Sequence, residues 1–317
     1  MAAIKNAILT QGLTKRYSDD VLALVGVDLE VPANSIYALL GPNGAGKTTT
    51  ISILTTLAKP TSGTAQVAGF DVVQQPGEVR RRIGVTFQET VLDVDLTGRQ
   101  VLLYHGRLYG LSKAACAQKM DELLALVELE SAADRRVGTY SGGMKRRLEL
   151  ARGLMTEPEI LFLDEPTLGL DPQNRAGIWH YIRDLKEQRG MTLLMTTHYM
   201  DEAEQLADQV GIIDNGRIVI EGTPQQLVDQ LGADVLRIKG QGAEADFLTR
   251  VNTLPFVENA VHSNSQLHIR VDSGNKRLVE IVQTAGETGF AIEDISITKP
   301  SLGDVFLQVT GRQFRDE

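Results

Sequence analysis

The sequence predicts an α/β protein, in which a domain built on a largely parallel sheet precedes a smaller α+β domain of the ferredoxin-like type. Three observations support this prediction. Short apolar runs alternate with helical patterns, the pattern is helical throughout residues 89–155, and the order strand, helix, strand, strand, helix, strand follows residue 232. We therefore expect two domains: residues 1–232, with a helical subdomain at about 89–155, and residues 233–317.

Four compact apolar runs account for the predicted parallel sheet: Ile36–Leu40, Ile160–Asp164, residues 193–197 and residues 210–214. Each is bounded by Gly, Pro or acidic residues. Each is apolar on both faces, as expected for strands that helices cover on both sides. These runs predict the core of the first domain.

Two segments predict the helical subdomain. Residues 119–130 carry Leu123, Leu124 and Val127 at helical spacing, and the pattern of residues 141–155 continues without a break. Because both lie between predicted strands, we interpret them as an insert within the α/β domain.

The second domain is predicted from six short elements. They are residues 235–239, Glu244–Val251, 257–261, 267–271, 276–284 and 291–298. The third and fourth form a hairpin around Asn264, and residues 301–309 form a closing helix capped by Ser301. We expect this domain to be an accessory or regulatory one whose closing helix packs on a neighbouring subunit.

The composition excludes several classes of protein. Lys and Arg number 32 against 41 Asp and Glu, which gives a net charge of −9 and argues against a nucleic-acid partner. The single Cys116 excludes an internal disulfide framework and fits a reducing compartment. There is no run of 18 apolar residues, and the first ten residues lack the apolar region of a secretory signal. We therefore expect no membrane span, and membrane association only through a partner.

A complete phosphate-binding loop follows the first predicted parallel strand. It reads Gly41-Pro42-Asn43-Gly44-Ala45-Gly46-Lys47-Thr48 and leads into a helical stretch at residues 48–57. Its glycines let backbone N–H groups turn toward phosphate oxygens, and the helix presents its positive end to the same anion. Lys47 is expected to reach the β- and γ-phosphates, and the Thr48 hydroxyl is expected to bind Mg²⁺. The alternative is a glycine-rich turn without a ligand.

An acidic pair, Asp164 and Glu165, ends the apolar strand at residues 160–164. An acidic pair at a strand end is often a solvated terminus or a helix cap. Downstream of a phosphate loop the pattern favours catalysis: Asp164 is expected to complete the Mg²⁺ shell, and Glu165 to polarise the water that attacks the γ-phosphate.

A serine–glycine–glycine turn opens a predicted helix at Ser141, Gly142 and Gly143. Ser141 is a natural helix cap, and the two glycines allow close approach to an anion. Taken alone, the turn also fits a capped helix with a solvated basic face at Lys145, Arg146 and Arg147.

Taken together, these motifs resemble those of the nucleotide-binding subunits of ABC transporters over roughly residues 5–225. The phosphate loop, Gln88, Ser141-Gly142-Gly143, the acidic pair, Asp171 and His198 occur in that family's order and spacing. Residues 140–149, 196–204 and 300–306 resemble more narrowly the daunorubicin-resistance type, which powers bacterial drug and lipid exporters. Met144 replaces a glutamine that many family members carry. The phosphate contacts expected of Ser141 and Gly143 do not depend on it.

The resemblance implies a role for each matched residue. Tyr17 stacks on adenine, although a half-buried strand tyrosine is the alternative. Gln88 senses Mg²⁺ and the γ-phosphate and leads into a loop, through Leu96 and Thr97, that receives the membrane partner. His198 contacts the γ-phosphate. The implied nucleotide-binding residues are Tyr17, Gly41, Pro42, Asn43, Gly44, Ala45, Gly46, Lys47, Thr48, Thr49, Ser141, Gly142, Gly143 and Asp171. The implied catalytic residues are Lys47, Gln88, Glu165 and His198, and the implied Mg²⁺ site is Thr48, Gln88 and Asp164.

The function that the resemblance implies is ATP hydrolysis with Mg²⁺ by a homodimer that holds ATP between its subunits. The dimer lies peripherally at the cytoplasmic side of the cell membrane and drives export through a separate transmembrane permease. Transport in the other direction is one alternative. A soluble ATPase that acts on a macromolecule is another. Ser141 follows Gln88 by only 53 positions, which leaves no room for the long coiled coil of the DNA-repair relatives, and the chain has one cassette where the translation-factor relatives have two.

Overall fold

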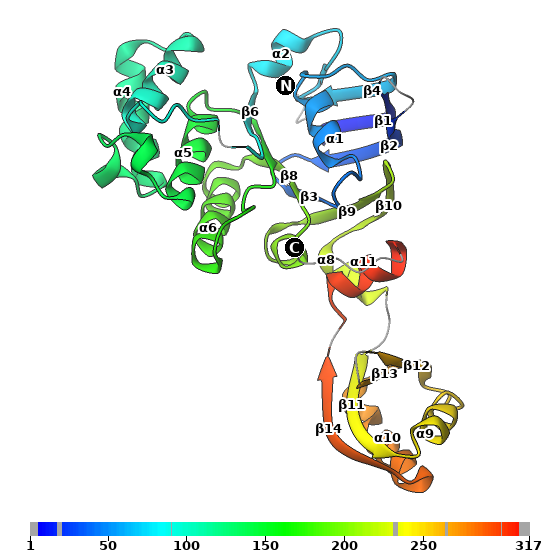
Figure 1. Cartoon of the computed structure of the whole chain (residues 1–317). Helices are drawn as coiled ribbons and strands as arrows, with labels where there is room; N and C mark the ends of the chain where they lie inside the picture. The colour runs from blue at the N-terminus through cyan, green and yellow to red at the C-terminus, as the bar shows by residue number, and fades with distance from the viewer. Residues whose placement is uncertain are drawn as a thin grey trace. The chain divides into compact units, whose positions relative to one another are not determined.

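The computed structural model describes residues 6–17, 21–89, 91–230, 234–263, 266–298 and 300–310. The chain divides into two compact units, residues 1–224 and residues 225–317 (Figure 1). The domain boundary expected at residue 232 and the hairpin turn expected around Asn264 lie outside the described residues.

A six-stranded sheet forms the centre of the first unit, in the order β10-β9-β3-β8-β7-β6. The strands are β3 (Ile36–Leu40), β6 (Ile83–Thr86), β7 (Ile160–Asp164), β8 (Thr192–Thr197), β9 (Gln209–Asp214) and β10 (Arg217–Gly222). All neighbours are parallel except β9 and β10. Every residue of β3, β7 and β8 is buried, so the prediction of covered parallel strands is confirmed.

A second, antiparallel sheet, in the order β2-β1-β4-β5, belongs to the same unit. Its strands are β1 (Asn6–Arg16), β2 (Leu22–Pro32), β4 (Ser62–Val67) and β5 (Phe70–Asp71). One apolar cluster joins it to the parallel sheet, since Ile8, Leu24 and Val67 share a core with Leu39 and Phe162. The helix that follows the phosphate loop, α1 (Lys47–Leu54), contacts strands of both sheets.

The helical subdomain contains α3 (Gly98–Leu108), α4 (Lys113–Leu126) and α5 (Gly142–Leu154), which pack on one another. Thr97, Ser112 and Ser141 cap these three helices through their side-chain oxygens. The helix predicted at residues 119–130 begins earlier because Ser112 caps it. It ends earlier because Glu128 adopts a left-handed conformation with φ of 53°. The other helices of this unit are α2 (Pro76–Arg80), α6 (Pro172–Arg189) and α7 (Met200–Leu206).

The second unit contains α8 (Pro224–Asp229), apart from its first residue, and a ferredoxin-like module. The elements of the module are β11 (Asp234–Gly242), α9 (Glu244–Val251), β12 (Val257–Ser263), β13 (Gln266–Val271), α10 (Gly274–Thr288) and β14 (Phe290–Thr298). The antiparallel sheet has the order β12-β13-β11-β14, as the sequence predicts for a ferredoxin-like module. In its core the rings of Phe247 and Phe290 stack with centroids 4.8 Å apart.

The closing helix is α11 (Leu302–Thr310). The Ser301 hydroxyl accepts a hydrogen bond from Asp304 N at 3.3 Å, and Ser301 N donates to the Asp304 carboxylate at 2.8 Å. Ser301 is therefore the cap that the sequence predicts. Within the described part of the chain, no helix is long and apolar enough to cross a membrane.

Candidate functional site

The phosphate loop connects β3 to α1 at the carboxyl end of the parallel sheet. Gly41 N donates to Thr197 O at 3.2 Å, which fixes the start of the loop on β8. A side chain at Gly41 would place its Cβ 2.4 Å from Ile213 O, and Gly46 has φ of 111°. Glycine is therefore required at both positions, once for space and once for backbone conformation.

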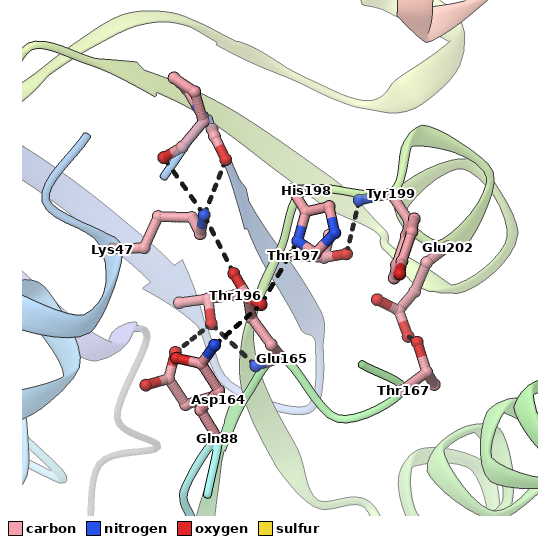
Figure 2. A network of polar contacts seen from close by, with 12 residues as sticks. Lys47, Gln88, Asp164, Glu165, Thr167, Thr196, Thr197, His198, Tyr199 and Glu202 are labelled. Atoms are coloured by element: carbon pink, nitrogen blue, oxygen red, sulfur yellow. Dashed lines mark hydrogen bonds and ion pairs between the residues drawn. The ribbon is translucent and has the colours of Figure 1, made fainter. Parts of the chain in front are cut away.

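Lys47 is the first residue of α1, and its side chain is buried. Nζ donates to Gly41 O at 2.8 Å and to Pro42 O at 3.3 Å, and it lies 3.1 Å from Glu165 Oε1. Figure 2 shows the lysine directed at the acidic end of β7. The ammonium group therefore lies between the loop and the carboxylate, where a phosphate group would meet both.

The acidic pair marks the end of β7, where Asp164 is the last strand residue and Glu165 follows it. Glu165 has φ of 47°, a left-handed conformation that costs a non-glycine residue about 1–2 kcal/mol. Its N–H donates to the Thr196 hydroxyl at 3.0 Å, and that hydroxyl donates in turn to Asp164 Oδ1. The neighbouring strand β8 thus holds both acidic residues in place.

Glu165 is the point at which the predicted catalytic residues meet. Besides Lys47, it contacts His198 Nδ1 at 3.3 Å through Oε2, and Gln88 Nε2 at 3.5 Å through the same oxygen (Figure 2). Burial raises the pKa of Glu165, but the hydrogen bond from His198 and the charge of Lys47 lower it by more, so that the pKa lies below its ordinary value. The carboxylate is therefore ionised at neutral pH and suited to orient a water molecule.

Two oxygen ligands lie beside this carboxylate. Thr48 Oγ1 donates to Asp164 Oδ1 at 3.4 Å. Hydroxyl and carboxylate oxygens suit Mg²⁺, which takes few protein ligands and completes its shell with water and phosphate oxygens. The described residues contain no group of three or more His, Cys, Asp or Glu side chains that could hold a metal without such help. The residues therefore fit a nucleotide-bound Mg²⁺ ion.

The serine–glycine–glycine turn lies on a different element, the start of α5. The Ser141 side chain accepts from Met144 N at 3.2 Å. A Cβ on Gly143 would lie 2.5 Å from Asn174 Oδ1, so the turn is packed against the start of α6. Asn174 donates to Asp171, the cap of α6, at 2.6 Å. The structure therefore joins the turn to Asp171, while Lys47, Gln88, Glu165 and His198 gather elsewhere.

Tyr17 directly follows β1 and keeps 43% of its surface exposed. Its N–H donates to Val21 O at 3.0 Å, and Lys15 Nζ lies 4.9 Å from the centre of its ring. An exposed ring is available for stacking, which a half-buried strand tyrosine would not be.

Two buried charged residues near the site are not among those that the sequence predicts. The alternative of a solvated basic face fails at Arg146, which is 5% exposed and donates to the backbone around Glu165. Glu202 is 1% exposed and accepts from the Thr167 hydroxyl at 2.8 Å and from Trp179 Nε1 at 3.0 Å. In a sequence, a buried charged residue is indicated when apolar residues at helical spacing lie on both sides of it. Helix α5 contains too many charged residues to show such a pattern.

A phosphate loop at the end of a parallel strand, opposite a carboxylate held by lysine, histidine and glutamine, defines a P-loop ATPase. Residues 24–168 match the family model for the ABC transporter, and residues 222–310 match that for the C-terminal domain of the ATP-binding protein DrrA1-3-like group. The chain belongs to the ABC transporter ATP-binding family, and within it to the daunorubicin-resistance type. It is an ATP-binding and ATP-hydrolysing subunit of a transporter.

Curated relatives match almost the whole chain. It is 43% identical to the daunorubicin/doxorubicin resistance ATP-binding protein DrrA of Streptomyces peucetius, over 98% of this chain and 94% of the relative. It is 40% identical to the doxorubicin resistance ATP-binding protein DrrA of Mycobacterium tuberculosis, over 96% of this chain and 93% of the relative. It is also 40% identical to the Nod factor export ATP-binding protein I of Burkholderia pseudomallei, over 96% of this chain and 97% of the relative.

Solved structures of ATP-binding cassettes resemble this chain. A dimeric post-hydrolysis state of the ATP-binding cassette MJ0796, bound to ADP and Pi, superimposes with a TM-score of 0.62 at 27% identity, over 68% of this chain and 98% of that one. The subunit cbiO1 of Clostridium perfringens, part of an ABC transporter complex, gives 0.66 at 26% identity, over 79% and 96%. These likenesses confirm the fold class.

Proposed function

We propose that this chain is the ATPase of an exporter that expels drug-like or lipid molecules through a separate membrane permease. It lies at the cytoplasmic face of the cell membrane. The assembly of Lys47, Gln88, Glu165 and His198 around one carboxylate carries the ATPase part of the proposal. The export direction is supported by the relatives named for drug resistance and for Nod factor export.

In this proposal each side chain has one role in hydrolysis. The phosphate loop and Lys47 bind the β- and γ-phosphates and neutralise charge that develops on them. Thr48 and Asp164 hold Mg²⁺, which supplies further charge neutralisation when bound. Glu165 orients the attacking water and accepts its proton. His198 and Gln88, which both lie beside the Glu165 carboxylate, contact the γ-phosphate.

The active unit is a homodimer with two composite ATP sites. The turn at Ser141 and Gly143 is packed on α6 rather than on its own phosphate loop, which supports a role opposite the phosphate loop of a second copy. ATP then binds both copies through its γ-phosphate, and hydrolysis releases them. The dimeric assembly of a similar cassette is consistent with this arrangement.

Glu165→Gln tests the dimer. The variant should bind ATP but hydrolyse it at least about 100-fold more slowly, so saturating MgATP should shift it from monomer to dimer in gel filtration with light scattering. Glu159→Gln is the matched control, because Glu159 is exposed and lies just before the same strand. A Glu165→Gln protein that stays monomeric at saturating MgATP contradicts the proposal.

Exposed apolar side chains support the membrane partner. Val91 and Val94, in the segment after Gln88, are 67% and 52% exposed, and Tyr104 and Leu108 on α3 are 49% and 84% exposed. Such side chains are expected to pack on the permease.

Transport in inverted membrane vesicles that hold this chain and its permease tests the export direction. ATP should drive uptake of daunorubicin or of a fluorescent lipid analogue, and Lys47→Ala should abolish it. ATP-driven loss of the probe from preloaded vesicles would indicate transport in the other direction.

A further inference from the structure

Arg146 lies on the second turn of α5, and its guanidinium group is buried beneath the end of β7. Each of its N–H-bearing nitrogens has an acceptor. The acceptors are Pro166 O for Nε at 2.7 Å, Asp164 O and Glu165 O for Nη2 at 2.9 Å each, and Phe87 O and Glu149 Oε2 for Nη1, the latter at 3.1 Å. A planar guanidinium with five N–H groups is the side chain that can fill this set.

These bonds fix the backbone on both sides of the catalytic carboxylate. Glu165 has φ of 47°, and a strained conformation persists only where its surroundings hold it. Arg146 Nη2 binds the carbonyl oxygens before and after that dihedral angle, while Thr196 accepts from the Glu165 N–H. Because the direction of a side chain follows from its backbone, Arg146 sets where the carboxylate points.

The same guanidinium also fixes the residue before Gln88. Arg146 Nη1 donates to Phe87 O, and Gln88 Nε2 then lies 3.5 Å from Glu165 Oε2. One rigid group on α5 therefore positions both side chains that are to contact the attacking water and the γ-phosphate.

We propose that Arg146 is a positioning residue that couples the orientation of α5 to the geometry of Glu165 and Gln88. This inference rests on the proposed dimer, in which the first residues of α5 bind the ATP of a second copy. Glu165 of the same chain then acts on the other ATP molecule. Engagement of one ATP by α5 is therefore transmitted through Arg146 to hydrolysis of the other.

Arg146→Lys is the direct test, because it keeps the charge but removes the planar fork. We expect kcat for ATP to fall about 10- to 100-fold, as for a misplaced catalytic group. The KM and the Kd for a fluorescent ATP analogue should stay within about twofold of wild type, because the phosphate loop is untouched. Any positive cooperativity in the dependence of turnover on ATP should be lost, with the Hill coefficient falling to 1.

Arg147→Lys is the matched control. Arg147 is the next residue of the same helix, and it donates to Val127 O and to Glu128, at 3.4 and 3.3 Å, away from the acidic strand end. Its kcat, KM and Hill coefficient should equal those of wild type.

A double-mutant cycle separates positioning from general damage. Glu165→Asp displaces the carboxylate by one methylene group and lowers kcat by itself. If Arg146 acts by placing this carboxylate, adding Arg146→Lys should lower kcat by a smaller factor than it does in wild type. Two equal factors would show that Arg146 does not act through Glu165.

A neutral pair of substitutions keeps the test valid if the lysine variant does not fold. Arg146→Gln with Glu149→Gln removes both buried charges and leaves neither unpaired. Glu149→Gln alone retains the carbonyl contacts of Arg146 but removes the charge that pairs with it, so it measures the contribution of that ion pair. The double variant should show the same loss of kcat at unchanged KM, and that loss should exceed the loss in Glu149→Gln alone.

Two results overturn the inference: a wild-type kcat in the folded Arg146 variants, or equal losses of kcat and of nucleotide affinity, which indicate a merely structural role. Failure of the proposed function looks different. In that case wild type does not hydrolyse ATP, or Glu165→Gln does not dimerise. If Arg146→Lys lowers kcat while Glu165→Gln remains monomeric, Arg146 positions the catalytic groups within one chain. The proposed coupling between two ATP sites is then refuted.

Discussion

The ionisation of Glu165 is set by a few neighbouring groups. Burial raises its pKa, and the hydrogen bond from His198 and the charge of Lys47 lower it further than burial raises it. The carboxylate form, which accepts the proton of the water, is therefore retained to lower pH than for an ordinary buried glutamate. This balance makes the pH dependence of turnover a test of the site.

His198→Ala should move the acid limb of kcat/KM to higher pH. The substitution removes the donor at 3.3 Å from Glu165 Oε2, so the pKa of Glu165 rises and the carboxylate is lost at a higher pH. Turnover measured from pH 4.5 to 8 gives the midpoint, and ionisation of the nucleotide is common to both proteins and cancels. His180→Ala, an exposed residue of α6, is the control. An unmoved acid limb would show that another group is responsible.

Glu202 gives a second test at this scale, now of stability. Burial raises its pKa, and hydrogen bonds from Thr197 and Thr167 only partly offset this. The folded chain therefore holds a proton that the unfolded chain releases above about pH 4.5. It follows that wild-type stability falls as the pH rises from there through the raised folded pKa.

Glu202→Gln should remove this loss. The amide oxygen can still accept from Thr167 and Trp179, and it does not titrate. The free energy of unfolding of the variant, measured by urea denaturation, should increase relative to wild type with rising pH, by at most about 1.4 kcal/mol per pH unit within that window. A difference that is constant from pH 4.5 to 8 would refute the argument.

At the scale of elements, the parallel strands could be predicted because each is a short apolar run with a clear boundary. Strands β1 and β2 could not, since bulges interrupt their alternation: their pairing shifts register four times. The phosphate loop and the acidic pair could also be predicted from the sequence, because the residues of each motif are contiguous. The role of Arg146 depends on carbonyl groups of Phe87 and Pro166, which no local pattern reveals.

The contact between α5 and α6 predicts opposite effects for two adjacent glycines. A Cβ at Gly143 would lie 2.5 Å from Asn174 Oδ1, so Gly143→Ala must displace Asn174 from its bond to Asp171. We expect a loss of about 1–2 kcal/mol in the free energy of unfolding of the first unit. At Gly142 the nearest atom is Leu170 Cδ2 at 4.0 Å, so Gly142→Ala should be neutral or stabilise by up to about 1 kcal/mol. Equal losses in urea denaturation would contradict this packing.

At the scale of the whole molecule, each of the two units has a hydrophobic core of its own. The parallel and antiparallel sheets share one core in the first unit, and the ferredoxin-like module has another around Phe247 and Phe290. The candidate ATP-binding residues all lie in the first unit. Ligand binding and core substitutions in the module should therefore act on separate unfolding transitions.

Phe247→Ala should lower the transition of the second unit alone. Phe247 is fully buried and stacks on Phe290, so its truncation should cost about 3–5 kcal/mol. Val279→Ala, at a 62% exposed position of α10, should change stability by less than about 0.5 kcal/mol.

ATP at 100 times its Kd should stabilise the first unit by about 2.7 kcal/mol and leave the transition of the second unit unchanged. Calorimetry of the full chain measures both transitions. A single transition that responds both to Phe247→Ala and to ATP would show that the two cores unfold together. ATP binding would then raise the stability of the module as well as that of the first unit.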